Sequence, residues 1–342
     1  MSMTVAIHPF SSFEALQHAV PDGRSEVMPL GRGRISGSIT QIALDAEFGV
    51  TSGSFSRGVR FGGVMSQHRW VLSMLIATDG PASALGRELA VGDMIMTAPG
   101  EERYSIYRDA TSYSAALVGQ QELEAFLAIQ AGATEALRSG VLRPADDATA
   151  ANRVRILSSL TETLAERGLS MPAGTVEFYK RNILELLTAP IRDLVDYRGP
   201  QPRRSYTELV RDIDRYLIEA GNRPVHISEL CDKFDVSRRA LHRAFLNVLG
   251  IAPIAFARRK RLCDVHEALS NPERDATIKE IAIEHGFVDL GRFATAYRLL
   301  FGERPSQTLR RRGGRLPLVW LVCCNLYRWA STIEWLLFSH RS

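Results

Sequence analysis

The chain has 342 residues, of which 45% are hydrophobic and 23% charged, a composition ordinary for a globular protein and a length that favours two domains. Its net charge of +4 is unevenly distributed: residues 1–202 carry 18 Lys+Arg against 22 Asp+Glu, whereas residues 203–312 carry 21 against 15. The four cysteines include no CxxC pair, which argues against a disulfide framework or a cysteine zinc site. The basic C-terminal part fits a nucleic-acid-binding region.

Residues 1–30 show no regular hydrophobic period, so we expect them to form an irregular lead-in. They contain no basic segment followed by a long apolar core, and a secretory signal peptide is therefore not expected. The sequence predicts a cytoplasmic protein.

Residues 33–118 contain short runs of β-branched and aromatic residues separated by Gly, Ser and Asp. This pattern predicts an antiparallel β sandwich or barrel. Within it, the segment GDMIMTAPGEE from Gly92 to Glu102 resembles the strand and turn of a cupin-type sensor domain. Metal-binding cupins place several histidines together, whereas only His68 lies nearby, so we predict no metal and no other cofactor.

The hydrophobic period becomes helical over residues 120–196. Val154, Leu157 and Leu164 share one helical face, and Tyr179 and Ile183 share another. These faces could pack on the sheet of the same chain or form a dimer seam, and the pattern leaves both open. The cupin-type resemblance implies that residues 1–199 are a sensor and dimerisation domain, and the proline- and arginine-containing segment 200–205 is predicted to be a linker.

Residues 206–312 contain an internal repeat, which is the strongest pattern in the sequence. Leu241 and Gly250 of the first copy correspond to Phe293 and Gly302 of the second, each 52 positions later. Each copy has two short amphipathic helices separated by a turn and closed by a glycine and a proline, as a helix-turn-helix unit does. The segment between the copies, 254–269, predicts a connecting helix whose basic cluster would position the DNA backbone or cover the helix: Arg258, Arg259, Lys260 and Arg261.

The second copy carries the motifs I-A-x-x-x-G-F at 281–287, F-x-x-x-Y-R at 293–298 and F-G-x-x-P-S at 301–306. With these motifs, residues 206–312 resemble the DNA-binding domain of the AraC/XylS family of transcription regulators. The resemblance implies two helix-turn-helix units joined by a connecting helix, which bind double-stranded DNA. Gly291 and Thr295 stand where the family usually has Ser and Arg, so we expect weaker base readout by the second unit.

Side chains that face outward from the second helix of each unit are the candidates for contact with DNA, because phosphate contacts position the protein and base-edge contacts select the sequence. Ser237 and Asp289 are the expected N-caps of these helices. The predicted DNA-binding residues are Ser237, Arg238, Arg239, His242, Arg243, Leu290, Arg292 and Thr295. By the resemblance, Arg239, His242 and Arg243 fall at base-reading positions.

Residues 313–342 form an apolar tail of unknown role. Asn325, Arg328 and Glu334 interrupt its hydrophobic stretch, 316–338, so a transmembrane helix is not expected there. An interfacial helix, a tail packed on the protein and a poorly ordered tail all stay open.

The predicted fold class is α+β: an antiparallel β, cupin-like N-terminal domain with helices, and an all-α C-terminal domain with two helix-turn-helix units. The predicted function is a sequence-specific, effector-responsive transcription regulator, which would bind a small molecule, form a homodimer and, if an activator, contact RNA polymerase. No nucleophile motif, phosphate-binding loop or metal cluster is found, so we predict no enzymatic activity. The alternatives are a cupin-like metal enzyme with a fused DNA-binding domain, and a regulator attached to a membrane through residues 316–338.

Overall fold

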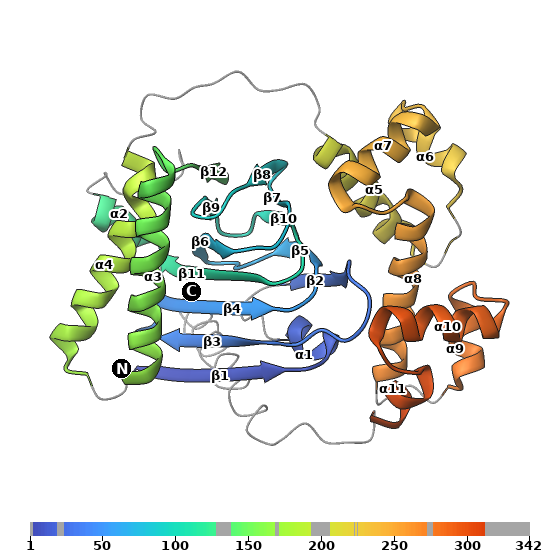
Figure 1. Ribbon diagram of the computed structural model, residues 1–342, viewed down its shortest axis with the longest axis horizontal. Helices are drawn as coiled ribbons and strands as arrows, with labels where there is room; N and C mark the ends of the chain where they lie inside the picture. Colours follow the sequence, from blue (N-terminus) through green and yellow to red (C-terminus); the bar gives the residue numbers. More distant parts are fainter. Residues whose placement is uncertain are drawn as a thin grey trace, which may run out of the picture.

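Figure 1 shows the computed structural model of the chain, with two antiparallel sheets flanked by long helices on one side and a group of shorter helices on the other. The structure describes residues 3–18, 24–127, 138–167, 171–192, 206–221, 223, 225–271 and 276–311. We call the described residues up to 192 the N-terminal region and those from 206 to 311 the C-terminal region. The predicted α+β fold class is confirmed. The predicted linker, 200–205, and the apolar tail, 313–342, lie outside the described residues.

The larger sheet has seven antiparallel strands in the order β1-β3-β4-β11-β6-β9-β12. Neighbouring residues of β11 point to opposite faces of this sheet, as the pleat requires. Ala116 and Val118 pack toward the long helices, whereas Ala115 and Leu117 face the second sheet. The strands are β1 (Thr4–Phe10), β3 (Gly37–Ala43), β4 (Phe48–Phe55), β6 (Arg69–Ala77), β9 (Met94–Thr97), β11 (Thr111–Gly119) and β12 (Gly140–Leu142).

The second sheet has five strands in the order β2-β5-β10-β7-β8, and it lies between the larger sheet and the C-terminal region. Its strand β10 separates two environments: Tyr104 and Ile106 pack against the C-terminal region, whereas Arg103 and Tyr107 face the larger sheet. The strands are β2 (Arg24–Pro29), β5 (Val59–Val64), β7 (Ala82–Ala84), β8 (Arg87–Leu89) and β10 (Glu102–Tyr107).

The expected irregular lead-in over residues 1–30 is wrong. This segment contains β1, helix α1 (Phe13–His18) and β2, so strand structure begins well before residue 33. Phe10, Phe13 and Leu16 are buried in an apolar cluster shared with the C-terminal region. Their burial depends on partners far away in the sequence, which a local hydrophobic period does not reveal.

Three helices cover the outer face of the larger sheet (Figure 1). They are α2 (Gln120–Leu127), α3 (Asp147–Arg167) and α4 (Ala173–Arg192). Leu157 and Leu164 of α3 and Ile183 of α4 are fully buried in one cluster with side chains of the sheet. These faces therefore pack on the core of their own chain, one of the two arrangements that the sequence left open.

The C-terminal region consists of helices, with α8 running between two groups of shorter ones (Figure 1). Within the described residues, no single helix is both long and apolar enough to cross a membrane; α7 and α8, bent by 57°, reach that length and composition only as a pair. The helices are α5 (Tyr206–Ala220), α6 (Ile227–Phe234), α7 (Arg238–Leu249), α8 (Pro253–Ser270), α9 (Ile278–Glu284), α10 (Leu290–Phe301) and α11 (Pro305–Arg311).

Candidate nucleic-acid interface

The first helix-turn-helix unit is α6 followed by α7, joined by a turn in which Asp235 has φ 51°. The Ser237 hydroxyl accepts a hydrogen bond from the backbone N–H of Ala240 at 3.1 Å, so Ser237 is the N-cap of α7, as expected. Gly250 ends the helix in the left-handed conformation, φ 69°, which glycine adopts without steric cost.

One face of α7 is buried and the opposite face is open to solvent. Leu241 and Phe245 are fully buried, as the sequence predicts, whereas Val248 is only half-buried and Leu249 completes the core. The exposed face presents three cations and one imidazole: Arg238, Arg239, His242 and Arg243. Within the described residues, the guanidinium groups of these three arginines form no ion pair, so they are available to an external anion.

The second unit is α9 followed by α10. Thr277 and Glu280 form a capping box at the start of α9, and Gly286 makes the corner with φ 79°. Asp289 caps α10 by accepting from the backbone N–H of Arg292 at 2.9 Å, as expected, and Gly302 ends it with φ 72°.

The outer face of α10 offers fewer hydrogen-bond donors than that of α7. The Arg292 side chain is 85% exposed, and its Nε lies 3.3 Å from the Asp289 carboxylate. Thr295 is exposed, but its hydroxyl donates to the Gly291 carbonyl at 3.0 Å. Leu290 does not face fully outward as predicted; it is half-buried and packs on the apolar cluster that this unit shares with the N-terminal region.

Helix α8 connects the two units and also contacts the N-terminal region. Lys260 is buried, with its Nζ 2.8 Å from Glu26 of β2, and the Arg259 guanidinium donates to the Leu30 carbonyl. The expectation that these two side chains position DNA or cover the helix is therefore wrong. Arg258 donates to the Arg292 carbonyl at 3.5 Å.

Glu26 also belongs to a buried ionic network at this junction. Arg60 of β5 is fully buried, with Nη2 3.0 Å from Glu26 and Nε 3.3 Å from Asp214 of α5. Burial acts to lower the pKa of Arg60, but the negative charges of Asp214 and Glu26 outweigh this effect and raise the pKa on balance. Burial likewise acts to raise the pKa of Glu26, but Arg60 and Lys260 lower it on balance. The network joins the two regions electrostatically.

The two C-cap turns of the repeat also touch the N-terminal region. Arg108 donates from Nη1 to the Leu249 carbonyl at 2.9 Å, at the end of α7. Gly33 donates its backbone N–H to the Leu299 carbonyl at 3.0 Å, near the end of α10. Each unit therefore contacts the N-terminal region at the end of its second helix, while the arginine side chains on the outer face of that helix remain exposed.

The contacts at this junction were missed by the sequence analysis, since Arg60, Asp214 and Lys260 are charged residues whose partners lie in other elements. A weak signal existed in α5, where Asp214 interrupts the apolar face made by Val210, Ile213 and Leu217. Among the described residues, no group of three or more His, Cys, Asp or Glu is placed to hold a metal ion.

Comparisons with known proteins find a matching family model in the C-terminal region. Residues 230–311 match the family model described as a helix-turn-helix domain. The XylDLEGF operon transcriptional activator 2 of Pseudomonas putida is 36% identical over 96 residues, which cover 28% of this chain and 61% of that protein. The XylDLEGF operon transcriptional activator of the same organism is 32% identical over 155 residues, covering 43% of this chain and 45% of that protein.

A solved structure is also similar to part of the chain. A probable AraC family transcriptional regulator from Rhodopseudomonas palustris CGA009 is 38% identical, and the match covers 30% of this chain and 96% of that one, with a TM-score of 0.30. The chain spans less than two thirds of the length of the two curated relatives named above.

Proposed function

We propose that this chain, which belongs to the AraC/XylS family of transcription regulators, activates transcription by binding specific sequences of double-stranded DNA. The observation that carries this proposal is the exposed row of Arg238, Arg239 and Arg243 on the second helix of a helix-turn-helix unit, which form no ion pair with any residue that the structure describes. A helix of this kind enters the major groove, where arginine can donate two hydrogen bonds to guanine. The names of its curated relatives, which are transcriptional activators, point the same way.

In the proposed complex, α7 makes most base contacts and α10 adds fewer. Arg239, His242 and Arg243 would meet base edges, while Ser237 and Arg238 at the start of α7 would meet phosphates. On α10, Arg292 is the principal donor, and Thr295 and Leu290 would make minor contacts. This division follows from the donors that each exposed face offers.

The remaining parts of the proposal concern partners and domain organisation. Residues 1–199 would sense a small-molecule effector and form a homodimer, residues 200–205 would link them to the DNA-binding domain at 206–312, and the activator would contact RNA polymerase in the cytoplasm. We propose no enzymatic activity. A stoichiometric metal in the purified protein would instead favour a cupin-like metal enzyme, and loss of membrane association on deleting residues 316–338 would favour a membrane-attached regulator.

The direct test is selection of bound sequences from a random pool of double-stranded DNA by the purified full-length protein, followed by footprinting. We expect enrichment of one sequence whose two protected segments lie about 34 Å apart, one turn of the double helix. Equal binding to all sequences, with no enriched site, would overturn the proposal.

A further inference from the structure

The outer faces of α7 and α10, the second helices of the two units, differ in chemistry at equivalent positions. Their N-caps, Ser237 and Asp289, are 52 positions apart, as are their terminating glycines, so the positions of the two helices correspond one to one. On α7 the exposed side chains of the first two turns all contain nitrogen: Arg238, Arg239, His242 and Arg243. Their counterparts on α10 contain none: Leu290, Gly291, Ala294 and Thr295.

This face of α10 is apolar and built from small residues. Gly291, Ala294 and Thr295 lie three and four positions apart, so they share one side of the helix, and all three are exposed. The Thr295 hydroxyl donates its proton to the Gly291 carbonyl at 3.0 Å, so it has no proton left to donate to a base. The methyl group of Thr295 is therefore the part of this side chain that suits an external contact.

Gly291 is the second residue of α10, where glycine lowers the stability of a helix relative to alanine. Its φ is the negative value of an ordinary helix, so the backbone conformation does not require glycine. The nearest atom that a Cβ would meet is Oδ1 of Asp289, at 3.4 Å, which is ordinary van der Waals contact. Since neither conformation nor packing demands glycine here, close approach of an external molecule to this face is the remaining physical reason for it.

The major groove of DNA offers such a face one apolar partner, the C5-methyl group of thymine. Arginine side chains like those of α7 are suited to the acceptor atoms of guanine. A surface of glycine, alanine and a threonine methyl group has no donor for those acceptors, whereas its size and polarity match the thymine methyl group. The two units therefore present different chemistry to the base pairs that each contacts, which we call its half-site.

We propose that α10 selects half-sites that contain thymine, with the Thr295 methyl group against a thymine C5-methyl group and Gly291 allowing the helix to approach the base edges closely. This inference rests on the proposed function and deepens it by naming the base that the second unit reads. A methyl contact contributes about 4-fold in affinity, as burial of one methyl group does. An arginine on α7 that binds guanine contributes roughly 5- to 150-fold, so the second unit selects sequence less strongly than the first.

The test uses the full-length protein and the DNA site obtained by selection from a random pool, with each thymine replaced in turn by uracil. Uracil pairs as thymine does and lacks only the C5-methyl group. Mobility shifts at fixed salt concentration should show a loss of about 4-fold in affinity at one or more of these positions. No loss at any position, or a selected site without thymine, would overturn the proposal.

Thr295→Ser locates the contact, because serine keeps the hydroxyl group and lacks the methyl group. It should weaken binding to the thymine site by about 4-fold and leave binding to the matching uracil site unchanged, so that uracil has no further effect at that position. Thr163→Ser is the matched control, since Thr163 of α3 also donates to the carbonyl four residues earlier, at 2.7 Å, and should leave both affinities unchanged. Uracil effects that all persist in Thr295→Ser would overturn the assignment.

Gly291→Ala separates close approach from helix stability. Alanine favours the helix and should maintain or raise the melting temperature, yet it should weaken DNA binding roughly 10-fold by placing a methyl group against the base edges. A role in the fold alone would move both quantities in the same direction. Gly174→Ala is the control, because Gly174 is the second residue of α4 and a Cβ there would meet no atom of the described residues within 4 Å. Full DNA affinity in Gly291→Ala would overturn the role of Gly291.

The outcomes separate this inference from the proposed function. A selected sequence that is indifferent to uracil would leave the proposed function standing and reject thymine reading by α10. The absence of any selected sequence would reject both.

Discussion

Arg60 of β5 and Asp214 of α5 form a buried ion pair across the junction of the two regions, with Nε 3.3 Å from Oδ2 and side chains 0% and 2% exposed. Glu26 is the second carboxylate that neutralises Arg60, with an oxygen 3.0 Å from Nη2. The pair therefore ties the first helix of the C-terminal region to the central part of the smaller sheet.

Removing Asp214 should destabilise the protein because it leaves part of a buried positive charge without its partner. We expect Asp214→Ala to lower the free energy of unfolding by about 3 kcal/mol, as for other broken buried pairs. Urea denaturation followed by tryptophan fluorescence measures this. Glu219→Ala, at an exposed position of the same helix, is the control, and equal effects of the two substitutions would contradict the prediction.

Specific DNA binding should depend most on α7. Arg239→Ala and Arg243→Ala are each expected to weaken binding to the selected site by about 1–3 kcal/mol and to relax the choice of base at one position. Electrophoretic mobility shifts at fixed ionic strength measure both effects. Arg155→Ala, an exposed arginine of α3, removes the same charge far from α7 and should leave affinity unchanged. Undiminished selectivity in the Arg239/Arg243 double variant would rule out this assignment.

The second unit should contribute affinity more than selectivity. Arg292→Ala removes the principal exposed donor of α10 and should reduce binding to specific and unrelated DNA alike, as loss of a phosphate contact does. The measurement is the slope of log affinity against log salt concentration, which should fall by about 1. A change in the preferred base at one position, with the salt slope intact, would show instead that Arg292 reads sequence.

The two equivalent C-cap glycines should respond differently to the same substitution. Gly250→Ala places a methyl group in a left-handed position and 3.0 Å from a flexible arginine tip, so a loss of about 1 kcal/mol is expected. At Gly302 the methyl carbon would also lie 2.7 Å from the backbone nitrogen of Arg34. Because backbone cannot move aside easily, Gly302→Ala should cost roughly 1–3 kcal/mol more. Equal melting temperatures for the two variants would contradict this.

Acid should weaken the contact between α5 and α6. Hydrogen bonds from Arg223 and Tyr216 hold the pKa of Glu229 at about 2, below its ordinary value of about 4.3. A lowered carboxyl pKa stabilises the fold above the unfolded value and loses that effect as pH falls, so the contribution of Glu229 should disappear between about pH 4 and pH 2. Carboxyl chemical shifts in an NMR titration measure the pKa. Arg223→Met should raise it, and an unchanged value would exclude this cause.

Local sequence patterns were sufficient to predict the C-terminal architecture. The repeat spacing located the caps Ser237 and Asp289 and the terminating glycines, because these signals act within a few residues of one another. The predicted DNA contacts themselves stay predictions. The buried face of α7 was predicted for Leu241 and Phe245, since helical period alone determines it.

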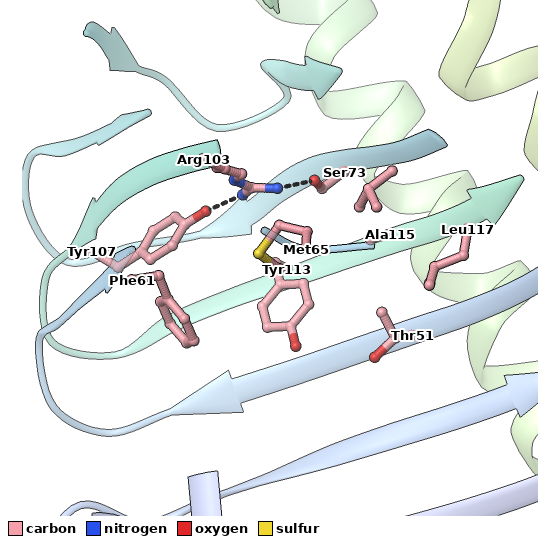
Figure 2. Close-up of a pocket in the computed structure, with 10 residues that line it drawn as sticks. Thr51, Phe61, Met65, Ser73, Arg103, Tyr107, Tyr113, Ala115 and Leu117 are labelled. Carbon is pink, nitrogen blue, oxygen red and sulfur yellow. Dashed lines mark hydrogen bonds between the residues drawn. The ribbon is translucent and has the colours of Figure 1, made fainter. Parts of the chain in front are cut away.

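The N-terminal contacts could not be predicted in the same way. Arg60 and Arg103 both lie in strands and look alike in sequence, yet Arg60 is neutralised by Glu26 and Asp214, whereas Arg103 donates hydrogen bonds to the hydroxyl groups of Ser73 and Tyr107 (Figure 2). Which partner a buried arginine finds depends on strand pairing and on the docking of α5, and no short window of sequence contains either. The alternation of Arg103, Ser105 and Tyr107 was the one local sign of a polar inner face.

Two of the apolar clusters draw side chains from both regions: Phe13 and Leu16 pack with Tyr297 and Phe301, and Tyr104 packs with residues of α5 and α7. Neither region can detach from the other without exposing buried apolar side chains of both to water. Heating should therefore unfold the protein in a single cooperative step rather than in two. A destabilising substitution in either region at this contact should lower the melting temperature of the whole protein.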